Sequence, residues 1–553
     1  MNELTMLLLT SVRWLLPVSL LLPAAGAPPA LDGYRRQPVD VEHYRFALVL
    51  ADSTDRIAGE ATVRMRLLAA GMTTVELDLA GVTPARQGRG MRVSEVMLDG
   101  TSLAFTHASD RLAITLAAPS TAGQRVAFVV RYAGIPADGL QIKPNRHGDR
   151  TFFSDDWPDK ARHWLPVIDH IADKATMEME VVAPVHYQVV SNGVRTEETD
   201  LANGMRRTVW LESVPIAPWL YALGVARFAV QRVGDYRGVP IETWVFAQDR
   251  DAGFHDFAVP SRDALAFYSE WVGPYSYEKL ANVQSNSVSG GMEAASAIFY
   301  SSGSVTGTRP LRWRNVVIHE IAHQWFGDAV TESDWNDVWL SEGFATYFTL
   351  LFIEHAYGRD EFAQGLRDSR KTVVDFTAKN PGYRVVHEHL TDMAQVTSSM
   401  TYQTGSWVLH MLRQRMGDDR FWAGMRDYYA RYRDGQASTA DFRHAMERAS
   451  GSDLSAFFDQ WLYRGGIPKI EGSWHWDAGA RQLQIELRQV QPGAPFAFPL
   501  EVGLEFAGAT LRVERVEFIG AAAILTVAAA QAPIAVVLDP YVRALFDGQL
   551  TRH

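Results

Sequence analysis

The chain has 553 residues, a formal net charge of -11 and an apolar fraction of 47%. This length and composition build several folded domains, so an intrinsically disordered protein is excluded. The acidic balance, with no long basic run, disfavours negatively charged partners, and we expect no nucleic-acid partner. Because the sequence contains no cysteine, disulfides and thiolate metal sites are excluded, and any metal must be held by His, Asp or Glu.

The first 27 residues have the pattern of a secretory signal peptide. An apolar run from Trp14 to Ala27 follows Arg13 and ends in small residues, with Ala25-Gly26-Ala27 as the best cleavage point. The run is short for a membrane span and two prolines interrupt it, so we expect cleavage; an uncleaved anchor is the alternative. The sequence therefore predicts a secreted or periplasmic protein with no stable membrane span after signal removal.

Three regions with different periodicities follow the predicted signal peptide. Alternating or β-branched segments separated by turn residues occupy residues 37–230 and predict an antiparallel β domain. Residues 231–466 change to a helical period, with a strand or two near the start (VPIETWVFA), and predict a mainly α-helical domain. Residues 467–553 return to short strands and predict a small β-sandwich. The predicted fold class is therefore α+β in several domains.

The segment VVIHEIAHQWFGD, from Val316 to Asp328, places titratable groups in an otherwise apolar helix. His319 and His323 are four residues apart, hence on one helix face, and two imidazoles there can reach one ion at about 2.0–2.1 Å. Glu320 is rotated about 100° around the axis, so it can touch a water on the ion but cannot easily share the coordination. The alternative is a pair of hydrogen-bonded core histidines, because so short a pattern also arises by chance.

A candidate third ligand lies downstream in DVWLSEGFATYF, where Glu342 follows His323 by nineteen positions. The alternative, a buried acid paired with Lys or Arg, finds no such base within a helical turn of Glu342. Two histidines and one glutamate leave one tetrahedral position open for water, which is typical of a catalytic rather than a structural zinc site. The sequence therefore predicts one zinc ion per chain.

The stretch HEIAHQWFGDAVTESDWNDVWLSEGFATY resembles the aminopeptidase N family of zinc metallopeptidases, which are gluzincins and include the leukotriene hydrolases. KARHWLPVIDHIADKATMEMEVVAP and FFDQWLYRGGIPK extend the resemblance over nearly the whole mature chain. It implies a short bacterial-type member with an N-terminal β saddle, a thermolysin-like catalytic domain and a C-terminal module.

The segment SGGMEAASAIFY resembles the Gly-x-Met-Glu-Asn strand of the same family. Gly290, Gly291, Met292 and Glu293 match, whereas Ala294 stands where asparagine is usual. The resemblance implies that Glu293 binds the free amine of the substrate. Two glycines let a peptide backbone approach closely, and a carboxylate can select a cationic N-terminus. The alternative is a turn glycine pair beside a solvated glutamate.

A second departure concerns the first domain, where the family places a Gln or Glu five residues before Arg162. Here that position is Trp157, whose indole cannot accept a bond from an amine. Asp155 or Asp156 could accept the bond from the amine instead, but neither stands at the family's spacing from Arg162. These departures leave it open whether exopeptidase specificity is relaxed.

SSMTYQTGSWVLHMLR resembles the family's Tyr-x-Lys-Gly element, with Tyr402 in the place of the catalytic tyrosine and Thr404 replacing the common lysine. The resemblance implies that the phenol donates to the oxyanion that forms on attack. The alternative is an ordinary core tyrosine ahead of an amphipathic helix.

These features predict a zinc aminopeptidase that hydrolyses the N-terminal bond of peptides with a free N-terminus, with Glu320 as general base. Two alternatives stay open: an endopeptidase or epoxide-type hydrolase on the same scaffold, and a non-catalytic peptide-binding relative. The preferred N-terminal side chain, the physiological substrate and the oligomeric state are not encoded in any local pattern.

Overall fold

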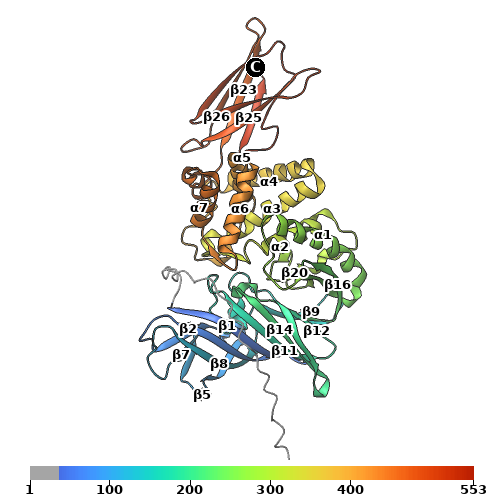
Figure 1. Cartoon of the computed structure of the whole chain (residues 1–553), viewed down its shortest axis with the longest axis vertical. Helices are drawn as coiled ribbons and strands as arrows, with labels where there is room; N and C mark the ends of the chain where they lie inside the picture. Colours follow the sequence, from blue (N-terminus) through green and yellow to red (C-terminus); the bar gives the residue numbers. More distant parts are fainter. Residues whose placement is uncertain (1–36, 553) are drawn as a thin grey trace, which may run out of the picture. The chain divides into compact units, whose positions relative to one another are not determined.

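The computed structural model describes residues 37–552, and the predicted signal peptide, residues 1–27, lies outside the described residues. Figure 1 follows the chain by colour: strands in blue to teal, then mainly helices from green to orange, then strands in red. Within the described range, none of the helices has both the length and the apolar character needed to cross a bilayer.

An eight-stranded sheet dominates the N-terminal region. In order across the sheet its strands are β13 (Val194–Asp200), β14 (Met205–Ile216), β11 (Ala175–Pro184), β1 (Val39–Val49), β2 (Ile57–Leu67), β8 (Gln124–Ile135), β4 (Gly90–Leu98) and β5 (Thr101–Ser102). Alternate residues of β1, such as Tyr44, Phe46 and Leu48, are buried, as the alternating pattern predicts. The pairing is antiparallel as expected except between β1 and β11, which run parallel.

Two smaller sheets complete this region. One comprises β3 (Thr74–Asp78), β7 (Arg111–Thr115) and β6 (Phe105–Ala108). The other comprises β12 (Gln188–Ser191), β15 (Leu223–Ala226), β10 (Arg150–Ser154) and β9 (Leu140–Pro144).

The middle region opens with a five-stranded mixed sheet, where the sequence had predicted only a strand or two. Its strands, in order, are β16 (Phe228–Tyr236), β17 (Val239–Phe246), β18 (Leu280–Ser285), β20 (Ala297–Ser301) and β19 (Gly291–Met292). β18 is buried at every position, so it lacks the alternation that marks a half-exposed strand. β19 has only two residues, and its partner β20 positions it beside the helices.

The helices that follow carry the candidate site. They are α1 (Arg250–Trp271), α2 (Leu311–His323), α3 (Trp339–Tyr357), α4 (Arg359–Lys379), α5 (Gly405–Met416), α6 (Asp418–Tyr432), α7 (Thr439–Ser450) and α8 (Ser455–Phe458). A π-helical turn at Met400–Thr404 precedes α5, and β21 (Val330–Glu332) pairs with β22 (Gly435–Ala437) in a two-stranded sheet. α2 begins after Pro310, as expected, but ends four residues before Gly327, and the chain turns through the intervening residues.

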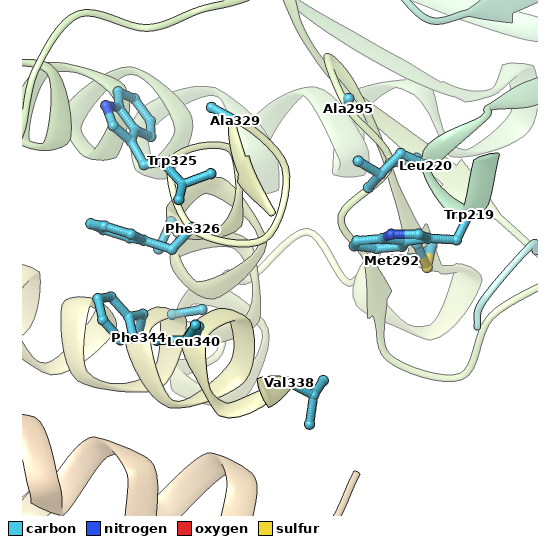
Figure 2. Packing of buried hydrophobic residues seen from close by; sticks show 14 of the residues in the cluster. Trp219, Leu220, Met292, Ala295, Trp325, Phe326, Ala329, Val338, Leu340 and Phe344 are labelled. Carbon is cyan, nitrogen blue, oxygen red and sulfur yellow. The ribbon is translucent and has the colours of Figure 1, made fainter. Parts of the chain in front are cut away.

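α2 and α3 are held together by aromatic packing at the end of α2. Phe326 lies 5.0 Å from Phe344 and 4.5 Å from Phe348 between ring centroids, and Figure 2 shows Phe326 and Phe344 facing each other. α3 is buried along most of its length because its sequence is apolar on nearly all sides, which makes it the central helix of this region.

The C-terminal region consists of two sheets. The first contains β27 (Ala522–Ala528), β24 (Gln482–Gln489), β23 (Lys469–Asp477) and β29 (Asp547–Arg552); the second contains β26 (Arg512–Phe518), β25 (Phe498–Glu505) and β28 (Ala535–Leu538). The predicted α+β fold class is confirmed: an N-terminal β-rich part, a mainly helical part and C-terminal β-sheets.

Candidate metal centre

Three of the predicted site residues meet where α2 passes α3. His319 Nε2 and His323 Nε2 lie 3.1 Å apart. Glu342 Oε2 lies 3.5 Å from the first of these nitrogens and 3.2 Å from the second. The two histidines come from successive turns of α2, and Glu342 comes from the first turn of α3.

The spacing of these three atoms fits a single metal ion. A tetrahedral ion with donors at about 2.0–2.1 Å holds them about 3.3 Å apart. Glu342 Oε2 is buried against the two imidazole nitrogens, and burying this carboxylate costs free energy unless positive charge compensates it. Burial acts to raise the pKa of Glu342, but hydrogen bonds with His319 and His323 outweigh it and hold that pKa at about 2. The residues present therefore offer one anionic and two imidazole donors.

The contacts of His323 select which of its ring nitrogens faces the metal. Its Nδ1 lies 3.1 Å from the carbonyl oxygen of Phe326 and 3.0 Å from Ser341 Oγ. A carbonyl only accepts, so Nδ1 carries the proton. The lone pair of Nε2 therefore points into the space that it shares with His319 Nε2 and Glu342 Oε2, where a metal ion would bind. Burial acts to lower the pKa of His323, whereas the surrounding carboxylates, led by Glu293, raise it well above its usual range. This negative surrounding favours a cation.

Glu320 is buried beside the donors without being one of the three. Burial, followed by the charges of Glu293 and Glu342, raises the pKa of Glu320 well above its usual range, and a bound divalent cation acts in the opposite direction. Gly291 packs against this side chain: a Cβ there would lie 2.2 Å from Glu320 Oε1. Gly291 thus makes room for Glu320, while a Cβ at Gly290 would meet nothing within 4 Å.

Glu293, the predicted amine anchor, follows β19 directly and is buried at the same cavity. Its Oε1 lies 3.9 Å from His323 Nδ1, and donor atoms of Glu293, Glu320 and His323 lie within 4.8 Å of one another. Burial and the charge of Glu342 raise the pKa of Glu293 to about 7, against the opposing effect of His323. The carboxyl groups of Glu293, Glu320 and Glu342 thus lie together at one cavity, which suits a substrate that carries an ammonium group.

Tyr402 reaches the same centre from the π-helical turn ahead of α5. Its hydroxyl donates to Glu342 Oε1 at 2.5 Å, and its ring stacks on that of His319 at 6.1 Å between centroids. Burial and the neighbouring charge of Glu342 raise the pKa of Tyr402 well above its usual range, so the phenol keeps its proton and can donate it. The sequence predicted a phenol near the metal but not this bond to a metal donor.

The two aspartates near Trp157 face different surroundings. Asp156 is buried and accepts the indole N–H of Trp164 at 2.8 Å. Asp155 accepts from the Gln141 amide at 3.4 Å, and its charge contributes to the raised pKa of Glu293. Trp157 packs edge-on against Trp219 and Trp335, with ring centroids 4.9 Å apart in each pair. The charge of Asp155 thus acts on the candidate anchor, whereas Asp156 is engaged by Trp164.

The predicted site residues other than Met292 line one cavity of about 650 Å³: Gly290, Gly291, Glu293, His319, Glu320, His323, Glu342 and Tyr402. Besides the predicted site residues it is lined by side chains of α2, α3 and α4: Arg312, Asn315, Val316, Thr346, Thr349, Leu350, Ile353, Asp368, Ser369 and Thr372. The cavity therefore continues away from Glu293 along α3.

Sequence reasoning missed Gln324, the residue directly after His323. It is fully buried and bonds to the backbone of Glu293 and Ser296. The only local indication was a polar residue inside an apolar stretch, and that pattern does not say which partner the residue has.

The fold and the donor set together place the chain among proteins whose metal site is built on an HExxH helix with a downstream glutamate. Two family models match: "Peptidase M1 N-terminal domain" over residues 40–220 and "Peptidase family M1 domain" over residues 261–461. The chain belongs to peptidase family M1, and the family membership inferred from its motifs is confirmed.

Individual relatives are similar at low identity. Glutamyl aminopeptidase of Rattus norvegicus is 26% identical over 57% of this chain and 35% of its own length, and aminopeptidase A of Gloydius brevicauda is 28% identical over 58% and 34%. The chain thus spans about a third of the length of these curated relatives. A solved structure, the M1 zinc metallopeptidase from Deinococcus radiodurans, aligns with a TM-score of 0.64 at 25% identity over 77% of this chain and 93% of its own.

Proposed function

We propose that this protein is a zinc-dependent aminopeptidase that hydrolyses the first peptide bond of substrates with a free N-terminus. The observation that carries the proposal is the cluster of His319, His323 and Glu342, with three donor atoms 3.1–3.5 Å apart and with Glu320 and Glu293 on the same cavity. Similarity to relatives called aminopeptidases and to a zinc metallopeptidase supports it.

One zinc ion per chain, held by His319, His323 and Glu342, would supply Lewis-acid chemistry, because it lowers the pKa of a water and polarises a carbonyl. Glu320, buried beside these donors, takes the proton of the attacking water and passes it to the leaving amine. Tyr402, whose hydroxyl donates to Glu342 Oε1 in the free protein, redirects that hydrogen bond to the oxygen on which negative charge develops.

Glu293 supplies the specificity in this proposal. Its carboxylate binds the substrate ammonium, so the first carbonyl is the one that reaches Glu320 and the metal donors. The cavity continues along α3 on the other side, where the remainder of the peptide fits.

The test compares a peptide with its N-acetylated form. We expect the wild-type protein to prefer the free amine by at least about tenfold in kcat/KM, and Glu293→Gln to lose about 10–100-fold on the free amine only. Glu354→Gln, on the same helix as Glu342 but ion-paired with Arg359 and Arg413 away from the site, is the matched control. Equal cleavage of both peptides, or internal cleavage products, would favour an endopeptidase.

We also propose that the protein is secreted or periplasmic. The apolar run from Trp14 to Ala27 and the small residues that end it support this location.

A further inference from the structure

Gln324 closes the turn that carries the candidate amine anchor. It follows His323 directly and is fully buried. Its Nε2 donates to the backbone carbonyl of Glu293 at 2.8 Å, and its Oε1 accepts from the backbone N–H of Ser296 at 2.8 Å. These two backbone groups are the two ends of the turn between β19 and β20. One side chain of the metal-binding segment therefore holds both ends of that turn.

The second N–H of the Gln324 amide is also occupied. Nε2 donates to Asp328 Oδ2 at 2.6 Å, whereas Oε1 lies 3.1 Å from the Tyr275 hydroxyl, whose one proton also reaches the Lys279 carbonyl at 2.9 Å. A primary amide has two N–H donors and a carbonyl acceptor, so both donors are used and the acceptor is engaged by Ser296. The orientation of the amide is set, because the Ser296 N–H can only donate and the Glu293 carbonyl can only accept.

The turn itself is constrained from its opposite side. Ser296 has a φ of +62°, a conformation that costs free energy in a residue other than glycine. Asn192 Nδ2 donates to the carbonyl of Ala295 at 2.6 Å, and the N–H of Gly193 donates to Ser296 Oγ at 2.8 Å. The turn is thus held between the N-terminal β region and α2, and Gln324 is its connection to the helix that carries His319 and His323.

We propose that Gln324 is a positioning residue that sets the separation of the Glu293 carboxylate from the metal donors, and so restricts cleavage to the first peptide bond. The proposal rests on the aminopeptidase function proposed above. In a peptide, only two covalent bonds, of about 1.46 and 1.52 Å, separate the N-terminal nitrogen from the first carbonyl carbon. An anchor that shifts by about 1 Å therefore misplaces that carbonyl, and such a misplacement can cost about 10²-fold in rate.

The experiment measures kcat/KM for one peptide with a free amine and for the same peptide N-acetylated, in wild type, Glu293→Gln and Gln324→Leu. Gln324→Leu keeps a similar volume and removes the hydrogen bonds of the amide to Glu293, Ser296 and Asp328. We expect its free-amine kcat/KM to fall about 10–100-fold while the N-acetylated rate stays within about twofold. A general loss of packing would instead lower both rates by the same factor. Metal content per chain, measured in parallel, should match wild type.

Thr331→Val is the matched control, because Thr331 is fully buried nearby and donates to the carbonyls of Gly327 and Asp328 without touching the turn. Its free-amine preference should equal that of wild type. Gln324→Glu keeps the acceptor for Ser296 and loses the amide donors. Its preference for the free-amine peptide should lie between those of wild type and Gln324→Leu, and this variant replaces Gln324→Leu in the test if the latter does not fold. An undiminished preference in both Gln324 variants overturns this inference alone, whereas a wild-type protein without any preference overturns the aminopeptidase function and the inference with it.

Discussion

At the scale of single residues, the candidate site depends on the lack of a side chain at Gly291 as much as on the side chains that are present. Gly291 is required because Glu320 occupies the space in which a Cβ would lie, with Glu320 Cγ only 2.4 Å from that position. Interior side chains are close-packed, so an added methyl group there has to displace the carboxyl group.

We therefore expect Gly291→Ala to imitate the loss of the proposed base. Glu320→Gln should lower kcat by about 10²–10⁴-fold, and Gly291→Ala by about 10²-fold because the carboxyl group is displaced rather than removed. Both variants should retain the metal, since neither residue is among the three donors. Assays of turnover alongside metal analysis check this.

Gly520→Ala is the control for an added methyl group, because a Cβ there meets nothing within 4 Å. A Gly291→Ala protein with wild-type turnover would show that Glu320 can move without consequence and is not the base.

At the scale of elements, α3 and α5 approach closely through two glycines. A Cβ on Gly343 would lie 2.9 Å from the Cα of Gly405, and a Cβ on Gly405 would lie 3.0 Å from the Cα of Gly343. Gly343 follows Glu342 directly, and Gly405 comes three residues after Tyr402. The close crossing therefore brings the hydroxyl of Tyr402 to the carboxylate of Glu342.

Gly405→Ala should force the two helices apart. We expect it to cost about 1–3 kcal/mol in the free energy of unfolding, as overpacking does in a filled core, and to weaken metal binding because the bond from Tyr402 orients Glu342. Chemical denaturation and metal competition with a chelator measure the two effects. Gly382→Ala, with no atom within 4 Å of its Cβ, should change neither. Unchanged metal affinity in Gly405→Ala would show that the helix crossing does not govern Glu342.

At the scale of the whole molecule, the C-terminal strands are tied to the helices by buried polar contacts. Arg370 of α4 pairs with the buried Asp539 and donates to the carbonyl of Ala544 at 2.7 Å. His410 of α5 lies with its Nε2 2.9 Å from the carbonyl oxygen of Val542. Removing one partner of such a pair leaves an uncompensated buried group, so these contacts favour one arrangement of the C-terminal sheets.

The proposed export also concerns the whole molecule. Expressed in a Gram-negative bacterium, the chain should appear in the periplasm with an N-terminus just after Ala27, because the apolar run is too short for a stable span. Cell fractionation followed by N-terminal sequencing measures this. A chain without residues 2–27 should stay in the cytosol, and full-length protein confined to the cytosol would contradict the proposal.

The sequence by itself determined the fold class, because periodicity of two or of 3.6 residues is a local property of the chain. It also predicted which groups gather at the candidate metal centre: the α-helical repeat places His319 and His323 on one face, and the motif adds Glu342, which the structure brings beside them. The family followed from the same stretch, and the family models confirm it.

Only the tertiary structure decided contacts between segments far apart in the sequence. The parallel pairing of β1 with β11 joins segments more than 120 residues apart, and no local periodicity encodes such a partner. The same holds for Gly291 against Glu320, Tyr402 on Glu342, and Gln324 across the turn from Glu293 to Ser296. A side chain's type and period show whether it is buried, whereas its hydrogen-bond partner depends on how complete elements pack, and that is settled only when the chain has folded.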